Sequence, residues 1–398
     1  MRNRTVQAIL LAAGVLSGCG GGADDEDTRV RGDTLTVYMS VPANGVSAAG
    51  GKAATAGAAR ALDEAGGRAA GRRVKLVTLP STRPGDAMWD PGTVEANAER
   101  PGDDPTAIAY IGELDLGGSA VSLPATNRDG VLQVSPADGL KSLTGTPPGR
   151  PRAGPERYYP EDVRTFVQLV PDDLELAEAM LGAVRRLGAG RPALVHTQGV
   201  SERELAGMLA DRSRAGGAEP VAVEVLREEG VAADVADSLG AADPDAILLA
   251  GVRGPATSAL LDALADSMPA VPVIASSGMA GFDPGDRAPL QTYAYTPIAP
   301  PGARSAKARR LLTGLSRSRG EEVGPEALNG YEAMRLVLDA IERGGADRLA
   351  VARAALEPRN RRSVLGSYSV ERTGEVEGLP LHLTAAGGGP VPRALNVP

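Results

Sequence analysis

Few residues in this chain belong to the types that usually carry out catalysis. It contains one cysteine, Cys19, and two histidines, His196 and His382, and neither histidine stands in a metal-ligand or catalytic-triad pattern. The stretch 45–49 holds a serine but lacks the second glycine that the sharp turn of a serine nucleophile requires. No complete glycine-rich phosphate or dinucleotide loop follows a strand-like run. We therefore predict no enzymatic activity, no cofactor and no metal site.

The chemistry that Cys19 indicates is lipid attachment. Basic residues precede an apolar stretch at 6–16, and small residues separate that stretch from Cys19, which is the order of a secretory signal. The run Leu16-Ser17-Gly18-Cys19 resembles the lipobox of bacterial lipoproteins. This resemblance implies that residues 1–18 are a signal peptide and that a diacylglycerol on Cys19 anchors the protein to the extracytoplasmic face of the cell membrane. The alternative is a plain secreted protein with a chance cysteine.

The remainder of the chain has the composition of a water-soluble protein of two lobes. Residues 19–33 are rich in glycine and acidic side chains, which predicts a flexible tether. The 380 residues left after removal of 1–18 from 398 exceed what one hydrophobic core usually serves. The formal net charge of -8 and the sequence pI near 5.1 argue against nucleic acid as a partner, because phosphates require clustered basic residues.

The elements that must position any site alternate between short β-branched runs and longer stretches with helical spacing. Ala54, Ala58 and Ala61 fall on one face of a helix expected at 50–64, and Gly66 marks its end. Alternating apolar strands and helices predict an α/β fold with two doubly wound parallel-sheet lobes. We expect strands at 35–40, 74–79, 107–111, 131–135, 193–196, 221–226, 246–249 and 271–275, and further helices at 172–187, 201–215, 231–239, 256–268, 304–319 and 325–343.

Two segments, 166–170 and 291–297, are expected to cross between the lobes as hinge strands. The first lobe then comprises 34–167 plus 297–357, and the second comprises 168–296 plus 358–398. A cleft at the carboxyl ends of the strands of both lobes is the expected ligand site.

A series of short motifs then occurs in order between Leu35 and Tyr368. It resembles the type I periplasmic binding proteins, specifically the branched-chain amino acid receptors of ABC importers, which bind leucine, isoleucine or valine. The motifs are Ala65-Gly66-Gly67 with Gly71-Arg72-Arg73-Val74, then 108–113, Ser122-Leu123-Pro124, 132–136, Tyr158-Tyr159-Pro160, 164–166, 170–173, 244–247 and Asn329-Gly330-Tyr331-Glu332-Ala333.

The resemblance implies a two-lobed receptor that closes on a small polar solute, an amino acid or an amide-like compound, and presents it to an ABC permease in the membrane. In that family the loops equivalent to 114–119 and 135–139 hold the carboxylate of the amino acid with backbone N–H groups and hydroxyls. The candidates here are Ser119, Ser135, Ala137, Asp138 and Gly139. Where the family usually has a serine this chain has Leu116-Gly117-Gly118, with Ser119 later, and where a threonine is usual it has Ala137-Asp138-Gly139. The carboxylate of Asp138 would repel that of a substrate.

In the family, the second lobe supplies an aromatic residue and an acid for the substrate ammonium. The corresponding loops, 197–201 and 276–279, contain neither. We hypothesise that the protein does not bind free leucine-type amino acids in the usual way. Two alternatives to an import receptor remain open: a sensor that reports ligand occupancy to a membrane partner, and a degenerate scaffold that has lost its ligand. The second-lobe candidates are Gln198, Val200, Gly251, Gly278 and Met279.

Overall fold

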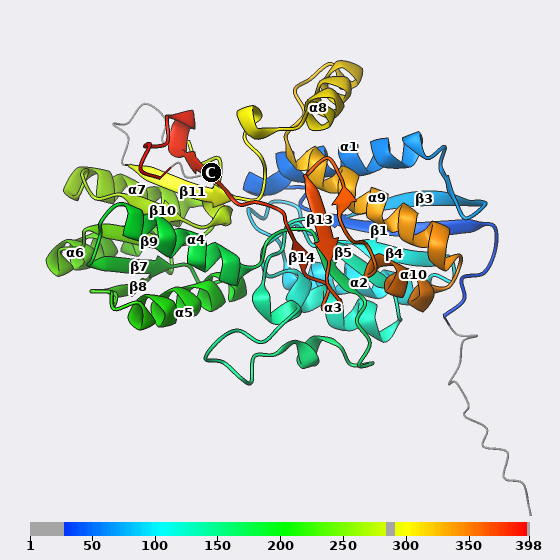
Figure 1. Ribbon diagram of the computed structural model, residues 1–398, viewed down its shortest axis with the longest axis horizontal. Coiled ribbons are helices and arrows are strands. Elements are labelled where there is room, and N and C mark those ends of the chain that lie inside the picture. Colours follow the sequence, from blue (N-terminus) through cyan, green and yellow to red (C-terminus); the bar gives the residue numbers. More distant parts are fainter. Residues whose placement is uncertain (1–27, 284–290, 396–398) are drawn as a thin grey trace, which may run out of the picture.

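The computed structural model describes residues 28–283 and 291–395, which form two α/β lobes side by side (Figure 1). Each lobe is built on a six-stranded, mostly parallel sheet with helices on both faces, so the predicted fold class is confirmed. Across the described ranges, none of the helices is long and apolar enough to cross a membrane.

The sheet of the first lobe has the order β2-β3-β1-β4-β5-β6, and only β2 runs antiparallel to its neighbour. Alternation along β1 divides its side chains between two layers: Val37 and Met39 pack into the main core, whereas Tyr38 faces the smaller cluster on the other side. The strands are β1 (Thr34–Val41), β2 (Arg68–Ala69), β3 (Arg72–Pro80), β4 (Ala107–Ile111), β5 (Leu132–Ser135) and β6 (Phe166–Gln168).

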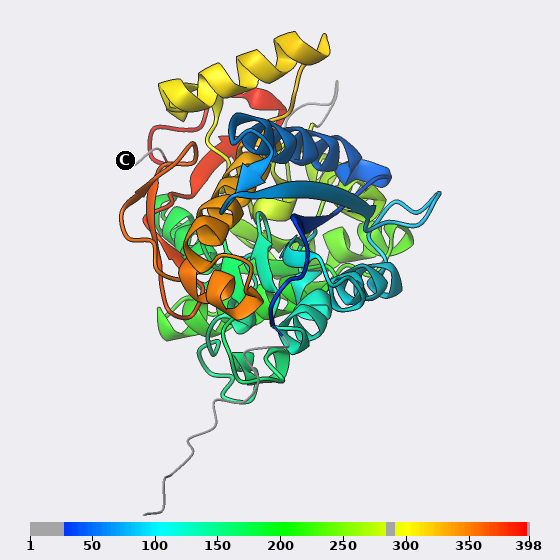
Figure 2. The same cartoon turned by 90° about the vertical axis from the view of Figure 1, so that its right-hand side faces the viewer.

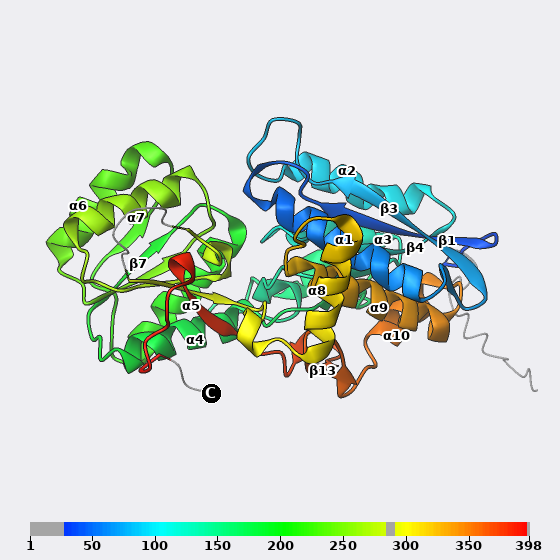
Figure 3. The ribbon, with the colours of Figure 1, turned by 90° about the horizontal axis from the view of Figure 1, so that it is seen from above.

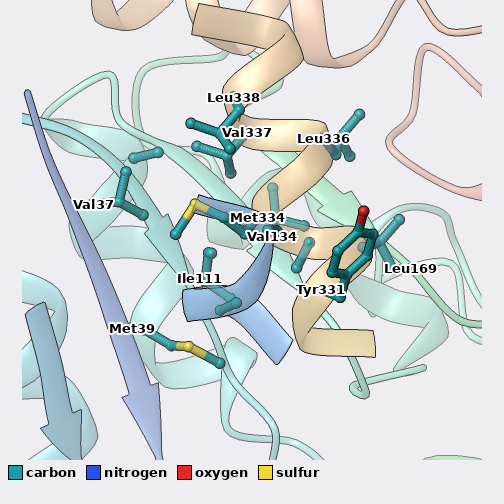
Figure 4. Packing of buried hydrophobic residues seen from close by; sticks show 14 of the residues in the cluster. Val37, Met39, Ile111, Val134, Leu169, Tyr331, Met334, Leu336, Val337 and Leu338 are labelled. Carbon is teal, nitrogen blue, oxygen red and sulfur yellow. The ribbon is translucent and has the colours of Figure 1, made fainter. Parts of the chain in front are cut away.

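Helices from both ends of the sequence cover the main face of this sheet. Helix α1 (Ala48–Glu64) lies against α9 (Glu326–Gly344), whose Met334 and Val337 contact the strand side chains of the core (Figure 4). Helix α10 (Arg348–Ala355) extends this layer, and α8 (Ala306–Arg319) lies outside α1 (Figure 2). The opposite face is covered by α2 (Pro91–Asp103) and α3 (Ser119–Arg128), which were not anticipated.

The close approach of α1 and α9 depends on two glycines. A Cβ atom at Gly57 would lie 1.9 Å from the carbonyl oxygen of Ala327, and one at Gly330 would lie 2.0 Å from that of Ala54. Each backbone therefore passes where any side chain of the other helix would clash.

The second lobe repeats the architecture with the strand order β15-β11-β10-β9-β7-β8. Helices α4 (Asp173–Arg186) and α5 (Val200–Ala215) pack on one face, and α6 (Ala232–Ala242) and α7 (Pro255–Ser267) on the other. The strands are β7 (Pro192–His196), β8 (Val223–Val225), β9 (Ala246–Ala250), β10 (Val273–Ala275), β11 (Thr292–Thr296) and β15 (His382–Ala385), the last antiparallel to β11.

Within the described residues the chain passes between the lobes three times, at 169–172, 297–305 and 378–381 (Figure 3). The first two crossings fall at or beside the expected hinge segments, but the third corrects the expected boundary at 358. The small antiparallel sheet β12 (Arg361–Arg362), β13 (Ser367–Val370) and β14 (Val376–Glu377) packs on the first lobe, because Tyr368 and Val370 are buried in the same core as α9. Only the segment from β15 onward joins the second lobe.

The predicted tether of 19–33 also ends earlier than expected. Val30 is 5% exposed, its N–H donates to the carbonyl of Ala346, and Thr28 Oγ1 donates to Asp347 Oδ2 at 3.0 Å. The chain is therefore fixed to the first lobe from Thr28. The expected signal peptide and Cys19 lie outside the described residues.

A half-buried cluster of charges lies where the first and third crossings meet. Lys141 Nζ donates to Asp172 Oδ2 at 2.8 Å and also to Glu375, while Thr144 Oγ1 donates to the same Glu375 oxygen at 2.8 Å. Burial alone would lower the pKa of Lys141, but its bonds to the two carboxylates outweigh that and raise it. The cluster joins a loop of the first lobe to the start of α4.

Candidate binding cleft between the lobes

A cleft of about 540 Å³ separates the two lobes, and both sheets present the carboxyl ends of their parallel strands to it. The first lobe contributes the loops after β1, β3, β4 and β5, and the second contributes those after β7, β8, β9 and β10. Thr296 at the end of β11 and the first two residues of the second crossing, Pro297 and Ile298, also line the cleft. Because opposite walls belong to different lobes, a solute that spans the cleft touches both.

Apolar side chains gather at the first-lobe side of the cleft. Val46 and Met88 are each 44% exposed, an unusual exposure for large apolar residues, and both line the cleft. Trp89, the single tryptophan of the sequence, lies beside Met88 on the same wall, and Leu114 and Leu116 continue it. This wall suits the apolar body of a solute.

Charged side chains of both signs line the rest of the cleft. Arg227 and Arg253 come from the second lobe, Asp115 and Glu326 from the first, and Glu202 from the first turn of α5. Burial raises the pKa of Asp115 to about 6, although the hydroxyl of Ser81 donates to it at 2.8 Å. No group of three or more His, Cys, Asp or Glu side chains in the described ranges is arranged to hold a metal ion.

Asp138 lies behind the first-lobe wall with its side chain fully buried. Its carboxylate accepts hydrogen bonds from the N–H groups of Gly117 at 3.0 Å, Ser119 at 2.9 Å and Leu140 at 3.3 Å. Burial raises the pKa of Asp138, and these backbone donors oppose that shift. The backbone N–H groups at the start of α3 are therefore already hydrogen-bonded to a carboxylate of the chain itself.

The expected first-lobe site residues are placed on both sides of that wall. Ala137 lines the cleft. Ser119 and Ser135 are fully buried behind it, where Ser119 Oγ accepts from the N–H of Glu113 and Ser135 Oγ donates to the Glu113 carbonyl at 2.7 Å. The Gly139 carbonyl accepts from the N–H of Asp173, outside the cleft.

The expected second-lobe residues are divided in the same way. Gln198 and Gly278 line the cleft. Val200 instead packs beside the apolar cluster of the loop 140–159, Met279 is fully buried in the core, and the N–H of Gly251 donates to Ser276 Oγ beneath the wall. The sequence analysis did not name several residues of the cleft. Met88 and Trp89, the paired apolar residues of the loop after β3, gave a usable signal. Nothing local marks the others, which are Val46, Ser47, Arg227, Arg253, Thr257 and Glu326.

A smaller chamber of about 140 Å³ adjoins the cleft and shares Leu114, Ala137, Arg253 and Glu326 with it. Asn329, at the end of the first turn of α9, also lines this space and is 5% exposed. We refer to this space as the side chamber.

Two comparisons identify relatives of this chain, and a third, with curated protein sequences, finds no match. The profile of the family described as periplasmic binding protein matches residues 34–374. A leucine binding protein from Thermotoga maritima superposes with a TM-score of 0.71 at 21% identity, over 89% of this chain and 96% of that one.

Two further solved structures are similar. A solute binding protein of an ABC transporter from R. palustris in complex with benzoate gives a TM-score of 0.70 at 15% identity, over 89% of this chain and 94% of the other. A branched-chain amino acid transporter substrate binding protein from Streptococcus pneumoniae in complex with isoleucine gives 0.69 at 17% identity, over 89% and 97%. At these identities the structures establish the common fold.

Proposed function

The chain belongs to the periplasmic binding protein family, and on that premise we propose that it is the solute-binding receptor of an ABC importer. The family acts outside the cytoplasm and consists of transport receptors rather than enzymes. The observation that carries the proposal is the cleft itself: loops from the carboxyl ends of both sheets face one another across it. A solute that touches both walls favours the closed arrangement over the open one, and closure is the signal that a permease can read.

The ligand we propose is a small solute with an apolar part. Val46, Met88 and Trp89 supply the apolar surface, and the mixed charges of the opposite wall supply polar contacts. Asp138 already occupies the buried backbone donors of the first lobe. This supports the hypothesis that leucine-type amino acids are not held there through their carboxylate.

The test of the receptor proposal combines a thermal-shift screen with small-angle scattering. A library of amino acids, amides, amines and aromatic acids should contain solutes that raise the melting temperature, because binding to the folded state stabilises it by mass action. The same solutes should reduce the radius of gyration and alter the fluorescence of Trp89. Solutes that bind without closure would contradict the transport receptor, and a library in which no solute binds would favour the degenerate scaffold.

We also propose that a lipid on Cys19 anchors the receptor to the outer face of the membrane. The lipobox-like run supports this, and Thr28 lies only nine positions after Cys19, so the first lobe would sit close to the bilayer. In the native host, Cys19→Ser should release the protein from the membrane fraction into the soluble extracytoplasmic fraction. Unchanged membrane association of this variant would contradict the anchor.

A further inference from the structure

Asn329, which lines the side chamber, carries a buried hydrogen-bond acceptor that has no donor among the described residues. Asn329 Nδ2 donates to the carbonyl of Pro136 at 2.8 Å, which fixes the orientation of the amide, because the flipped form would set two oxygens against each other. Asn329 Oδ1 is shielded from solvent and accepts no hydrogen bond in the described part of the chain. A buried amide oxygen without a partner carries an uncompensated desolvation cost.

The neighbours of Asn329 define which chemistry could supply that donor. Glu326 lies three residues earlier on α9, lines both the cleft and the chamber, and makes no ion pair in the described residues. Its side chain is held over α1, since a Cβ at Gly50 would lie 3.3 Å from Glu326 Cγ. An amide oxygen and a carboxylate together accept N–H groups and disfavour a bare anion.

Arg253 supplies the complementary contact from the second lobe. It is the one basic residue among the described residues that line the chamber, and it too forms no ion pair there. Its guanidinium can donate to a carbonyl oxygen on the same head group. The volume of about 140 Å³ has room for a head group of a few heavy atoms and not for a large body.

From this geometry, and resting on the proposed receptor function, we propose that the side chamber takes a nitrogen-bearing head group, a primary carboxamide or an amine, whose N–H bonds to Asn329 Oδ1. Glu326 accepts a second N–H, and Arg253 faces the carbonyl when one is present. The apolar body of the solute lies in the main cleft against Met88 and Trp89. Because Oδ1 is shielded from solvent, the chamber wall beside Asn329 must shift for the head group to reach this oxygen.

The first test compares solutes that differ only in the head group. Phenyl, isobutyl and propyl bodies are each offered as the carboxamide, the amine and the carboxylate, so that benzamide, for example, is matched with benzoate. Calorimetry and Trp89 fluorescence should give at least one body whose carboxamide or amine binds about tenfold or more tightly than its carboxylate, the effect of one hydrogen bond to an otherwise unpaired buried group. Equal or tighter binding of every carboxylate, or no binding by any nitrogen-bearing member, overturns the chamber proposal.

The two proposals fail differently in this experiment. If carboxylates bind as tightly as their nitrogen-bearing counterparts and close the lobes, the receptor proposal is supported and the side-chamber proposal is contradicted. Failure of the whole solute library to bind or close the protein would contradict the receptor as well.

The second test removes the acceptor and uses a matched control. Asn329→Ala should weaken the preferred nitrogen-bearing solute about tenfold and leave its carboxylate counterpart unchanged. Asn97 is a buried asparagine whose Nδ2 likewise donates to a proline carbonyl, that of Pro80, at 2.7 Å, but it lies away from the cleft. Asn97→Ala should therefore disturb folding similarly without changing head-group preference, and equal effects of the two variants would overturn the assignment.

Glu326→Gln then separates the two head groups. Glutamine keeps an acceptor oxygen but loses the negative charge, so an amine should lose affinity while a carboxamide keeps it. If neither the amine nor the carboxamide loses affinity, Glu326 does not face the head group, and its assigned role is contradicted.

Discussion

Two fully buried carboxylates, those of Glu113 and Asp138, lie behind the first-lobe wall of the cleft. Glu113 is fully buried; its Oε1 accepts from Tyr110 at 2.6 Å, while Oε2 has no partner in the described residues. Burial raises its pKa from 4.5 to about 7, and the hydroxyl bonds only partly oppose this shift. The folded state therefore holds a proton on Glu113 at pH values where the unfolded chain has lost it.

The first prediction concerns the pH dependence of stability. Because the folded pKa of Glu113 exceeds the unfolded one, its contribution is complete below pH 4.5 and is lost as the pH rises through about 7. Glu113→Gln should leave the free energy of unfolding at pH 4 almost unchanged and raise it by about 2 kcal/mol at pH 8. Urea unfolding across this range measures the difference, with the exposed Glu95→Gln as the control. If the free energy of unfolding changes with pH in the same way in the wild type and in Glu113→Gln, this prediction is refuted.

The second prediction concerns the donors that Asp138 occupies. In Asp138→Ala, the N–H groups of Gly117 and Ser119 lose their acceptor in a buried position, which should cost about 2–3 kcal/mol of stability at neutral pH. Asp90→Ala removes a solvent-accessible cap at the start of α2 and should cost about 1 kcal/mol. Chemical denaturation of both variants makes the comparison, and a smaller loss for Asp138→Ala would contradict the buried role.

At the residue scale, sequence reasoning located the cleft loops better than it located the cleft side chains. Ala137, Gln198 and Gly278 line the cleft because loops after parallel strands meet at one edge. Asp138 was recognised as unfavourable to a substrate carboxylate, but its inward turn onto Gly117 depends on the path of two loops that no local pattern encodes. Glu326 and Arg253 come together only through the arrangement of the lobes.

At the scale of elements, the helices and strands that the sequence predicted well were those with strong periodicity. The helix expected at 50–64 is observed as α1 at Ala48–Glu64, and the strand at 107–111 is observed unchanged as β4. Helices α2 and α3 were missed because proline lies inside each and their apolar residues are few. The sheet β12–β14 was missed because two of its strands have only two residues.

The third prediction tests the packing of α1 against α9. Gly57→Ala and Gly330→Ala should each destabilise the first lobe by roughly 3 kcal/mol, because the new methyl group would meet a backbone carbonyl at about 2 Å. Gly314→Ala is the control, since this exposed glycine of α8 has no atom within 4 Å of the new Cβ, and it should stabilise by about 0.5–1 kcal/mol. Thermal unfolding that moves all three in the same direction would contradict this packing.

The fourth prediction concerns the charge cluster at the crossings. Lys141→Met leaves Asp172 and Glu375 close together without their cation, which should cost about 3 kcal/mol at neutral pH. Lys52→Met, which breaks the exposed pair with Glu321, should change stability by less than about 1 kcal/mol. Equal losses for the two lysine variants would show that the cluster does not stabilise the crossings.

At the scale of the whole molecule, the sequence predicted two lobes and hinge segments but misplaced the last crossing. The reason is that the C-terminal hairpins hold few apolar residues, so their pattern alone does not reveal which core receives Tyr368 and Val376. The contacts in the folded protein show which lobe each segment packs on. Residues 358–379 stabilise the first lobe, while β15 forms the edge of the second sheet next to β11.

The interleaved course of the chain has a consequence for survival in a protease-containing environment. After a cut in the first connection, the C-terminal fragment would still supply α9 and α10 to the first lobe together with the whole sheet of the second. After a cut in the second connection, both fragments would contribute strands or helices to both lobes, so in either case the lobes would remain associated. A cut in the last connection would release neither, because two covalent links persist. With a single cysteine, the sequence offers no intramolecular disulfide to do this. The repeated passage of the polypeptide between the lobes holds them together in place of such crosslinks.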